Sequence, residues 1–144
     1  MHCLSCGRWF AIRQATRVRQ QFQPVERVKV KDKLFMLRPG FFSGSEGPFY
    51  CGDSVAVEGL LGFFPQLRNE VDVEYIDAPR PRMAIVELIG EANQSAPVLV
   101  LGAGRAPVDD GVAIHVSGQT RFIDSPDHIR RYLSSQYGVA HPAS

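Results

Sequence analysis

The chain has 144 residues, of which 44% are hydrophobic and 22% are charged, and its formal net charge is +1. This composition is typical of one globular domain. A domain of this size buries roughly two-thirds of the surface of its unfolded chain, so it needs no disulfide or metal for stability. No apolar run approaches the ~20 residues of a membrane span, and the first residues lack the apolar segment of a secretory signal. Three cysteines are too few for a disulfide framework, so we expect a reducing, cytoplasmic location.

The charge is unevenly distributed. Residues 1–31 contain seven Lys or Arg and one acid, a balance of +6, and the rest of the chain carries −5. The acidic body predicts a surface that does not bind nucleic acid. Residues 1–30 are basic and poorly periodic, and we expect a disordered extension outside the core. A basic arm that binds an acidic partner or a membrane, and an organelle transit peptide, stay open as alternatives.

The first elements follow this extension. A short apolar run at 33–38 predicts a strand, and the Gly- and Ser-rich segment 39–50 predicts a loop. A helix is expected over 53–64, with Asp53 near its start and Pro65 after its end. Apolar residues recur there at helical spacing: Val57, Leu60, Leu61 and Phe64.

The second half alternates similarly. In chain order we expect a strand at 71–77, a helix at 82–90, a strand at 97–101, hairpin strands at 112–116 and 120–123, and a last helix in "DSPDHIRRYLSSQYG". Gly90 is placed to cap the second helix. For the last helix, Ser125 is the expected N-cap, Pro126 stands in the first turn and Gly138 ends it.

The order of elements is β-α-β-α-β-β-α. Its first half predicts parallel strands joined by a crossover, and its second half adds antiparallel strands. We therefore expect an α/β fold in which helices cover both faces of one four- or five-stranded mixed sheet. The predicted domain spans residues 31–138, with 139–144 as a tail.

Three short segments add a resemblance to this pattern. They are Cys51-Gly52-Asp53-Ser54 after the first strand, Ser95-Ala96-Pro97 before the third, and Asp124-Ser125 at the last helix. In this order they resemble the thioredoxin-like fold, which includes glutaredoxins and glutathione-transferase N-terminal domains. The stretches "LFMLRPGF", "FYCGDSVAVEGLLGFFP", "VEYIDAPRPR" and "GEANQSAPVLVL" look like an uncharacterised bacterial family with that fold. The resemblance covers about residues 31–138.

The resemblance also implies roles for site residues. Cys51 and Ser54 would be catalytic, as a C-x-x-S form of the redox motif. Ala96 and a cis Pro97 would position a bound backbone. Asp124 and Ser125 would hold the γ-glutamyl end of glutathione. Partners would be glutathione or a small protein disulfide, with no tightly bound cofactor.

The chemistry of Cys51 can be argued for and against from neighbouring residues. A thiol at a helix N-terminus is favoured as thiolate by the free N–H groups and the macrodipole, and we expect the Ser54 hydroxyl to donate to it. With serine at position 54, a mixed disulfide needs an external thiol for its resolution. Against reactivity, the Asp53 carboxylate disfavours a thiolate, and free cysteines are often simply buried.

Other residues are ambiguous in the same way. On the resemblance, Arg80 and Arg82 would meet the far carboxylate of glutathione, but they can also be solvated. Two interpretations of Glu58 stay open: a buried acid that changes the pKa of the Cys51 thiol, or an exposed or partly solvated acid. Cys3 and Cys6 form only half of a metal-binding pattern, because no second pair follows at a usual spacing, so no metal site is predicted.

Two functions follow from these observations. The first is a thioredoxin-like thiol protein that performs monothiol disulfide exchange or binds glutathione; if it is an enzyme, it is a glutaredoxin-like thiol-disulfide oxidoreductase. The alternative is a non-catalytic thioredoxin-fold binding or dimerisation module, such as a homodimer, with an inert buried Cys51. Burial of Cys51 under segment 39–50 favours the module, whereas exposure beside Pro97 favours chemistry.

Overall fold

The computed structural model describes residues 29–143. Its elements are β1 (Asp32–Leu37), β2 (Phe41–Ser43), β3 (Glu46–Phe49), α1 (Gly52–Phe63), α2 (Leu67–Glu70), β4 (Val71–Ile76), α3 (Met83–Ile89), β5 (Val98–Val100), β6 (His115–Ser117), β7 (Thr120–Ile123) and α4 (Pro126–Tyr137). None of the helices in this part of the chain has the length and apolar character needed to cross a membrane. The predicted disorder of the N-terminal extension concerns residues that, up to position 28, lie outside the described range.

Five strands form one mixed sheet in the order β4-β1-β5-β7-β6. β1 and β4 are parallel, because α1 and α2 carry the chain back across the sheet between them. β5 is antiparallel to both β1 and β7, and β6 is antiparallel to β7. The predicted α/β fold with a mixed sheet of four or five strands is therefore confirmed, with five.

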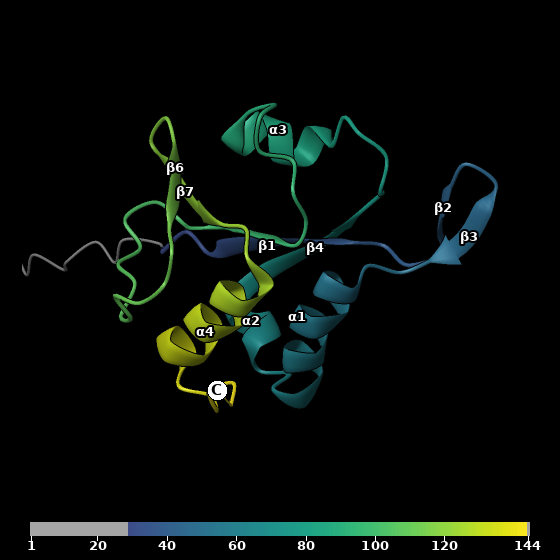
Figure 1. Cartoon of the computed structure of the whole chain (residues 1–144). Coiled ribbons are helices and arrows are strands. Elements are labelled where there is room, and N and C mark those ends of the chain that lie inside the picture. The colour runs from purple at the N-terminus through teal and green to yellow at the C-terminus, as the bar shows by residue number, and fades with distance from the viewer. Residues whose placement is uncertain (1–28, 144) are drawn as a thin grey trace, which may run out of the picture.

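Helices cover both faces of this sheet. α1, α2 and α4 lie on one face and α3 lies on the other (Figure 1). Because side chains alternate along a strand, β1 contributes Leu34 and Met36 to the core under α1 and α4, and Phe35 to the core under α3. The short central strand β5 divides its apolar residues in the same way, so the two cores meet along β1 and β5.

The prediction of an irregular loop over 39–50 is wrong, because this segment contains the β2–β3 hairpin. Phe41 pairs with Phe49 and Ser43 with Glu46, with a register irregularity between them. Five glycine and proline residues interrupt the apolar pattern between positions 39 and 50, so periodicity does not reveal the strands. The four-residue helix α2 was also not predicted, because one turn is too short to show a helical period.

The ends of α4 agree with the sequence prediction in position, but one capping hydrogen bond is absent. Pro126 opens the helix, and Gly138 ends it with a positive φ of 68°, both as predicted. Ser125 is the N-cap residue, as predicted, but its side chain makes no capping hydrogen bond. Because Pro126 has no N–H, this helix start has one free donor fewer to satisfy.

Candidate functional site

Cys51 is the N-cap residue of α1 and stands where the β2–β3 hairpin returns to the body of the protein. Its Sγ accepts a hydrogen bond from the backbone N–H of Ser54, at 3.5 Å. The side chain of Cys51 is half-buried, whereas Ser54 is buried. Ser54 Oγ accepts a hydrogen bond of 3.1 Å from the backbone N–H of Leu37, at the end of β1. The backbone of Ser54, rather than its hydroxyl, therefore provides the hydrogen bond to the sulfur.

The segment that precedes β5 lies beside the thiol. The Ala96–Pro97 peptide bond is cis, as predicted, and Pro97 is buried. The carbonyl oxygen of Ala96 lies 3.9 Å from Cys51 Sγ and can accept a weak hydrogen bond from the protonated thiol. Two segments that are 45 residues apart in the chain thus form one site.

Arg82 supplies a cation that sequence adjacency does not reveal. Its guanidinium donates to the carbonyl oxygens of Ala78, at 2.8 and 3.0 Å, and Gln94, at 2.6 Å. Burial lowers the pKa of Arg82 and the charge of Arg80 lowers it further, whereas the negative charge of a Cys51 thiolate acts in the opposite direction. Arg82 is therefore partly buried beside the thiol, and its hydrogen bonds connect two loops. The interpretation of Arg82 as a solvated arginine is wrong.

A pocket of about 150 Å³ opens beside the thiol. Its walls are mostly apolar and include Leu37, Tyr50 and Val55 as well as Cys51. Such a pocket can accept an apolar group next to the sulfur.

A polar group formed by Glu58, Tyr75 and Arg68 lies at the pocket. Glu58 and Tyr75 line it, and the Tyr75 hydroxyl donates a hydrogen bond of 2.7 Å to Glu58. Arg68 donates to Glu58 and, at 3.2 Å, to the Tyr75 oxygen. Burial raises the pKa of Tyr75, and the hydrogen bond to Glu58 raises it further. Glu58 is partly solvated and paired with Arg68, which matches the second of its two sequence interpretations.

The two residues expected to hold a γ-glutamyl group have other contacts. Asp124 pairs with His115 on β6, with 3.1 Å between Oδ1 and Nε2. It also lines a hollow of about 60 Å³ together with Ser95, the residue before Ala96. Within residues 29–143, no hydrogen bond joins Asp124 or Ser125 to Cys51. The structure therefore brings together Cys51, Ser54, Ala96 and Pro97, and it leaves the Asp124–Ser125 pair at the edge of that group.

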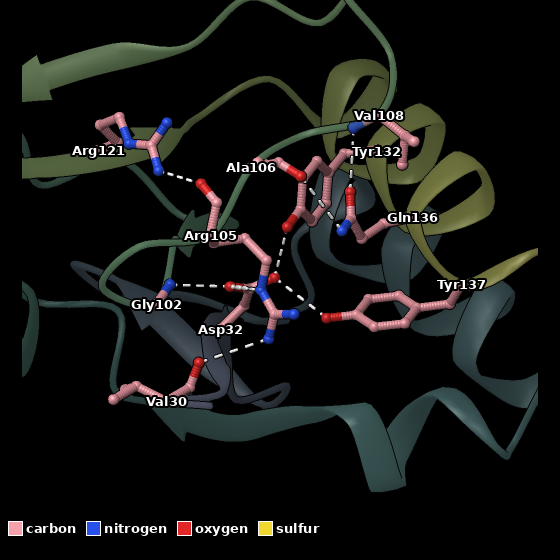
Figure 2. Close-up of polar contacts among 10 residues, drawn as sticks. All are labelled: Val30, Asp32, Gly102, Arg105, Ala106, Val108, Arg121, Tyr132, Gln136 and Tyr137. Carbon is pink, nitrogen blue, oxygen red and sulfur yellow. Dashed lines mark hydrogen bonds and ion pairs between the residues drawn. The ribbon is translucent and has the colours of Figure 1, made fainter. Parts of the chain in front are cut away.

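A second cluster, at the start of β1, was missed by the sequence interpretation (Figure 2). Asp32 is completely buried, and its carboxylate accepts four hydrogen bonds. The donors are Gly102 N at 2.8 Å, Arg105 Nε at 3.2 Å, Tyr132 Oη at 2.6 Å and Tyr137 Oη at 3.1 Å. Both oxygens are occupied by protein groups, so the cluster joins β1, α4 and the loop after β5 rather than offering a site to a ligand.

Burial raises the pKa of both tyrosines in this cluster. For Tyr132 the next cause is its hydrogen bond to Asp32, and for Tyr137 it is the negative charge of Asp32. In sequence, Asp32 stands between two lysines, a setting typical of a solvated strand end. The only feature of the sequence that could have indicated burial of Asp32 was its position directly before the apolar run at 33–38.

Among residues 29–143, no three His, Cys, Asp or Glu side chains are grouped closely enough to hold an ion. The half-pattern of Cys3 and Cys6 lies outside these residues.

Comparison with known proteins gives one positive finding. No curated protein and no solved structure matches the chain. A family model described as "Protein of unknown function (DUF3088)" matches residues 31–141, which include every element of the fold from β1 to α4. The chain therefore belongs to this family of uncharacterised proteins.

Proposed function

We propose that this protein is a thioredoxin-like thiol protein in which Cys51 performs monothiol disulfide exchange, with glutathione or a small protein disulfide as the partner. The single observation that carries the proposal is the setting of the sulfur. It is half-buried at the start of a twelve-residue helix, accepts the Ser54 N–H, and lies 3.9 Å from the carbonyl that precedes a cis-proline.

The arrangement of strands supports the thioredoxin-like part of the proposal. β1 and β4 are parallel neighbours joined through α1, and β5 and β7 continue the sheet in antiparallel fashion on the other side of β1. The resemblance drawn from the sequence implies this order of elements. Cys51 follows β1 and the β2–β3 hairpin, and the cis-proline Pro97 precedes β5, which supports the resemblance.

The chemistry follows from the positions of the polar groups. The thiolate attacks one sulfur of a disulfide, a new bond forms between Cys51 Sγ and that sulfur, and the second sulfur leaves as a thiolate that takes up a proton. The Ser54 N–H and the start of α1 stabilise the attacking anion. Because position 54 holds serine, an external thiol resolves the mixed disulfide: the thiolate of reduced glutathione attacks the partner's sulfur, a disulfide between glutathione and the partner forms, and Cys51 leaves as a thiolate.

The alternative function, a binding or dimerisation module, required an inert and buried cysteine. Cys51 is instead half-buried and opens into a pocket, which favours chemistry over simple packing. The glutathione site attributed to Asp124 and Ser125 remains a prediction, supported by the position of Asp124 beside Ser95.

The test uses the full chain with Cys3→Ser and Cys6→Ser, so that Cys51 is the only thiol. After incubation with oxidised glutathione, intact-mass spectrometry should find one glutathione per chain, and reduced glutathione should remove it. The matched control is Cys51→Ser in the same background, which should remain unmodified. If Cys51 acquires no glutathione, or reacts no faster than a cysteine in an unfolded peptide, the proposal is wrong.

A second variant tests the monothiol assignment. Ser54→Cys in the same background adds an internal resolving thiol three residues after Cys51, in the first turn of α1. This variant should release bound glutathione without added thiol and form a disulfide between positions 51 and 54. A mixed disulfide that persists as long in Ser54→Cys as in the parent would contradict a C-x-x-S geometry.

A further inference from the structure

The β2–β3 hairpin forms an arm that projects from the body of the protein beyond the start of α1 (Figure 1). β2 and β3 pair only with each other, in a two-stranded sheet separate from the five-stranded one. All four residues of β3 are exposed, and so are two of the three residues of β2. An isolated two-stranded hairpin is at best marginally stable in water. The arm therefore lacks, among residues 29–143, the cover that would stabilise it.

The exposed side chains of this arm are aromatic. Phe42 is 61% exposed, Phe49 41% and Tyr50 68%. Phe42 lies over Gly47, where an added Cβ would be 2.8 Å from the phenyl ring. Glu46 is the only charged residue between positions 39 and 50. Scattered apolar residues are normal on a surface, but several exposed aromatics on one segment with a single charged residue are typical of an interaction site.

A complementary feature lies at the base of the same arm. This feature is the pocket described above beside the Cys51 thiol. It is lined by Pro39 and Tyr50, at the two ends of the hairpin, and by Val55 of α1. Its volume of about 150 Å³ resembles that of a roughly 150 Å³ protein cavity that binds one benzene molecule. The pocket thus has room for one phenyl ring.

We propose that the arm and pocket form a homodimer interface, in which two arms pack antiparallel about a two-fold axis. In this arrangement the Phe42 ring of each chain enters the pocket at the base of the other arm. A two-fold axis makes both contacts at once, because the patch carries both the protruding ring and its receptor. The dimer does not depend on the reactivity of Cys51, although the ring of the second copy would cover that side of the thiol.

The exposed area sets the expected strength. At roughly 200 Å² for a fully exposed aromatic side chain, the exposed fractions of Phe42, Phe49 and Tyr50 correspond to about 340 Å². A standard interface buries about 800 Å² on each partner. The exposed backbone of the arm and the half-exposed Val55 add to the aromatic area. We therefore expect a small, apolar interface and a dissociation constant in the micromolar range, about 1–100 µM.

Sedimentation velocity of the full chain tests this proposal. Between about 1 and 200 µM, a range that brackets the expected dissociation constant, the wild-type protein should shift from monomer to dimer. Phe42→Ser should raise the dissociation constant at least about tenfold, as truncation of a central aromatic anchor does. The matched control is Phe63→Ser, which removes an 84% exposed ring at the far end of α1 and should leave the dissociation constant unchanged.

Val55→Gln tests the pocket without altering the hairpin. It places a polar group in the pocket wall and should weaken the dimer, while far-UV circular dichroism confirms that the fold is intact. A monomer at all concentrations overturns the proposal, and so does a dimer that Phe42→Ser and Val55→Gln both leave unaffected. Because none of these measurements uses the thiol, failure of the glutathione assays leaves the result of this test standing.

Discussion

Replacement of Asp32 by asparagine removes the only negative charge from the cluster that joins β1, α4 and the loop after β5. Asp32 is 0% exposed, and its two oxygens accept four hydrogen bonds, from Gly102 N, Arg105 Nε, Tyr132 Oη and Tyr137 Oη. The asparagine has nearly the same shape, but its NH₂ group must face donors on one side. The Arg105 guanidinium also loses its ion-pair partner.

The size of the effect follows from burial. Loss of one member of a buried ion pair costs about 3–5 kcal/mol. Arg105 retains 15% exposure of its side chain and can recover some hydration, which places the expected loss near the lower end, about 3 kcal/mol. That is a large share of the roughly 5–15 kcal/mol by which a domain of this kind is stable. The melting temperature should fall by roughly 10 °C.

Urea unfolding followed by far-UV circular dichroism measures this loss directly. The matched control is Glu74→Gln, the same chemical change in the adjacent strand β4, where the ion pair with Lys33 is partly exposed. This control should cost no more than about 1 kcal/mol. If Asp32→Asn loses no more free energy of unfolding than Glu74→Gln, the cluster does not stabilise the fold as argued.

Three further predictions concern other parts of the molecule. The pKa of Tyr132 is raised in the folded state, so its contribution to stability is complete below about pH 10 and falls at higher pH by about 1.4 kcal/mol per pH unit. Tyr132→Phe should remove this share of the slope of the unfolding free energy, whereas the share of Tyr137, whose pKa is also raised, should remain. Gly102→Ala should destabilise by roughly 1–3 kcal/mol, because a Cβ there would lie 2.1 Å from a backbone oxygen. The matched control Gly59→Ala, in an open helical position, should be neutral or slightly stabilising in the same urea titration. Arg82→Met should slow the reaction of Cys51 with oxidised glutathione by about threefold, because one partly buried cation near the sulfur stabilises the thiolate by less than about 1 kcal/mol, and Arg82→Lys should recover part of the rate. Equal rates in all three proteins would exclude an electrostatic role for this arginine.

Helices and strands in which apolar residues recur regularly over several residues were predictable from the sequence. In α1, Val57 and Leu61 recur at helical spacing and are both buried, and in β1 the apolar run fills both faces of the sheet. The ends of α4 were visible because Pro126 and Gly138 act through local backbone preferences. The hairpin at β2–β3 was not visible, because its aromatic residues follow no buried face and glycine and proline interrupt them.

The candidate site was predictable only where local and tertiary geometry coincide. Cys51 could be placed at the start of a helix from its neighbours, since helix capping depends on a few adjacent residues. The approach of Ala96 was expected on the resemblance alone. Arg82 was named on the resemblance, but its partly buried position beside the thiol could not be foreseen, because the carbonyl oxygens of loops far from position 51 in the chain hold its guanidinium.

The sequence by itself thus determined most of the helices and strands of the main sheet and its covering layers, though not the β2–β3 hairpin or α2, and where a thiol meets a helix start, because periodicity, capping and turn preferences act over a few residues. The tertiary structure decided which charges are buried. Asp32 stands between lysines in the chain, yet packing of β1 against α4 and the loop after β5 surrounds its carboxylate with donors. The tertiary structure also decided that the arm projects with exposed aromatic rings. Burial and the pairing of charges depend on segments far apart in sequence, and no local pattern records them.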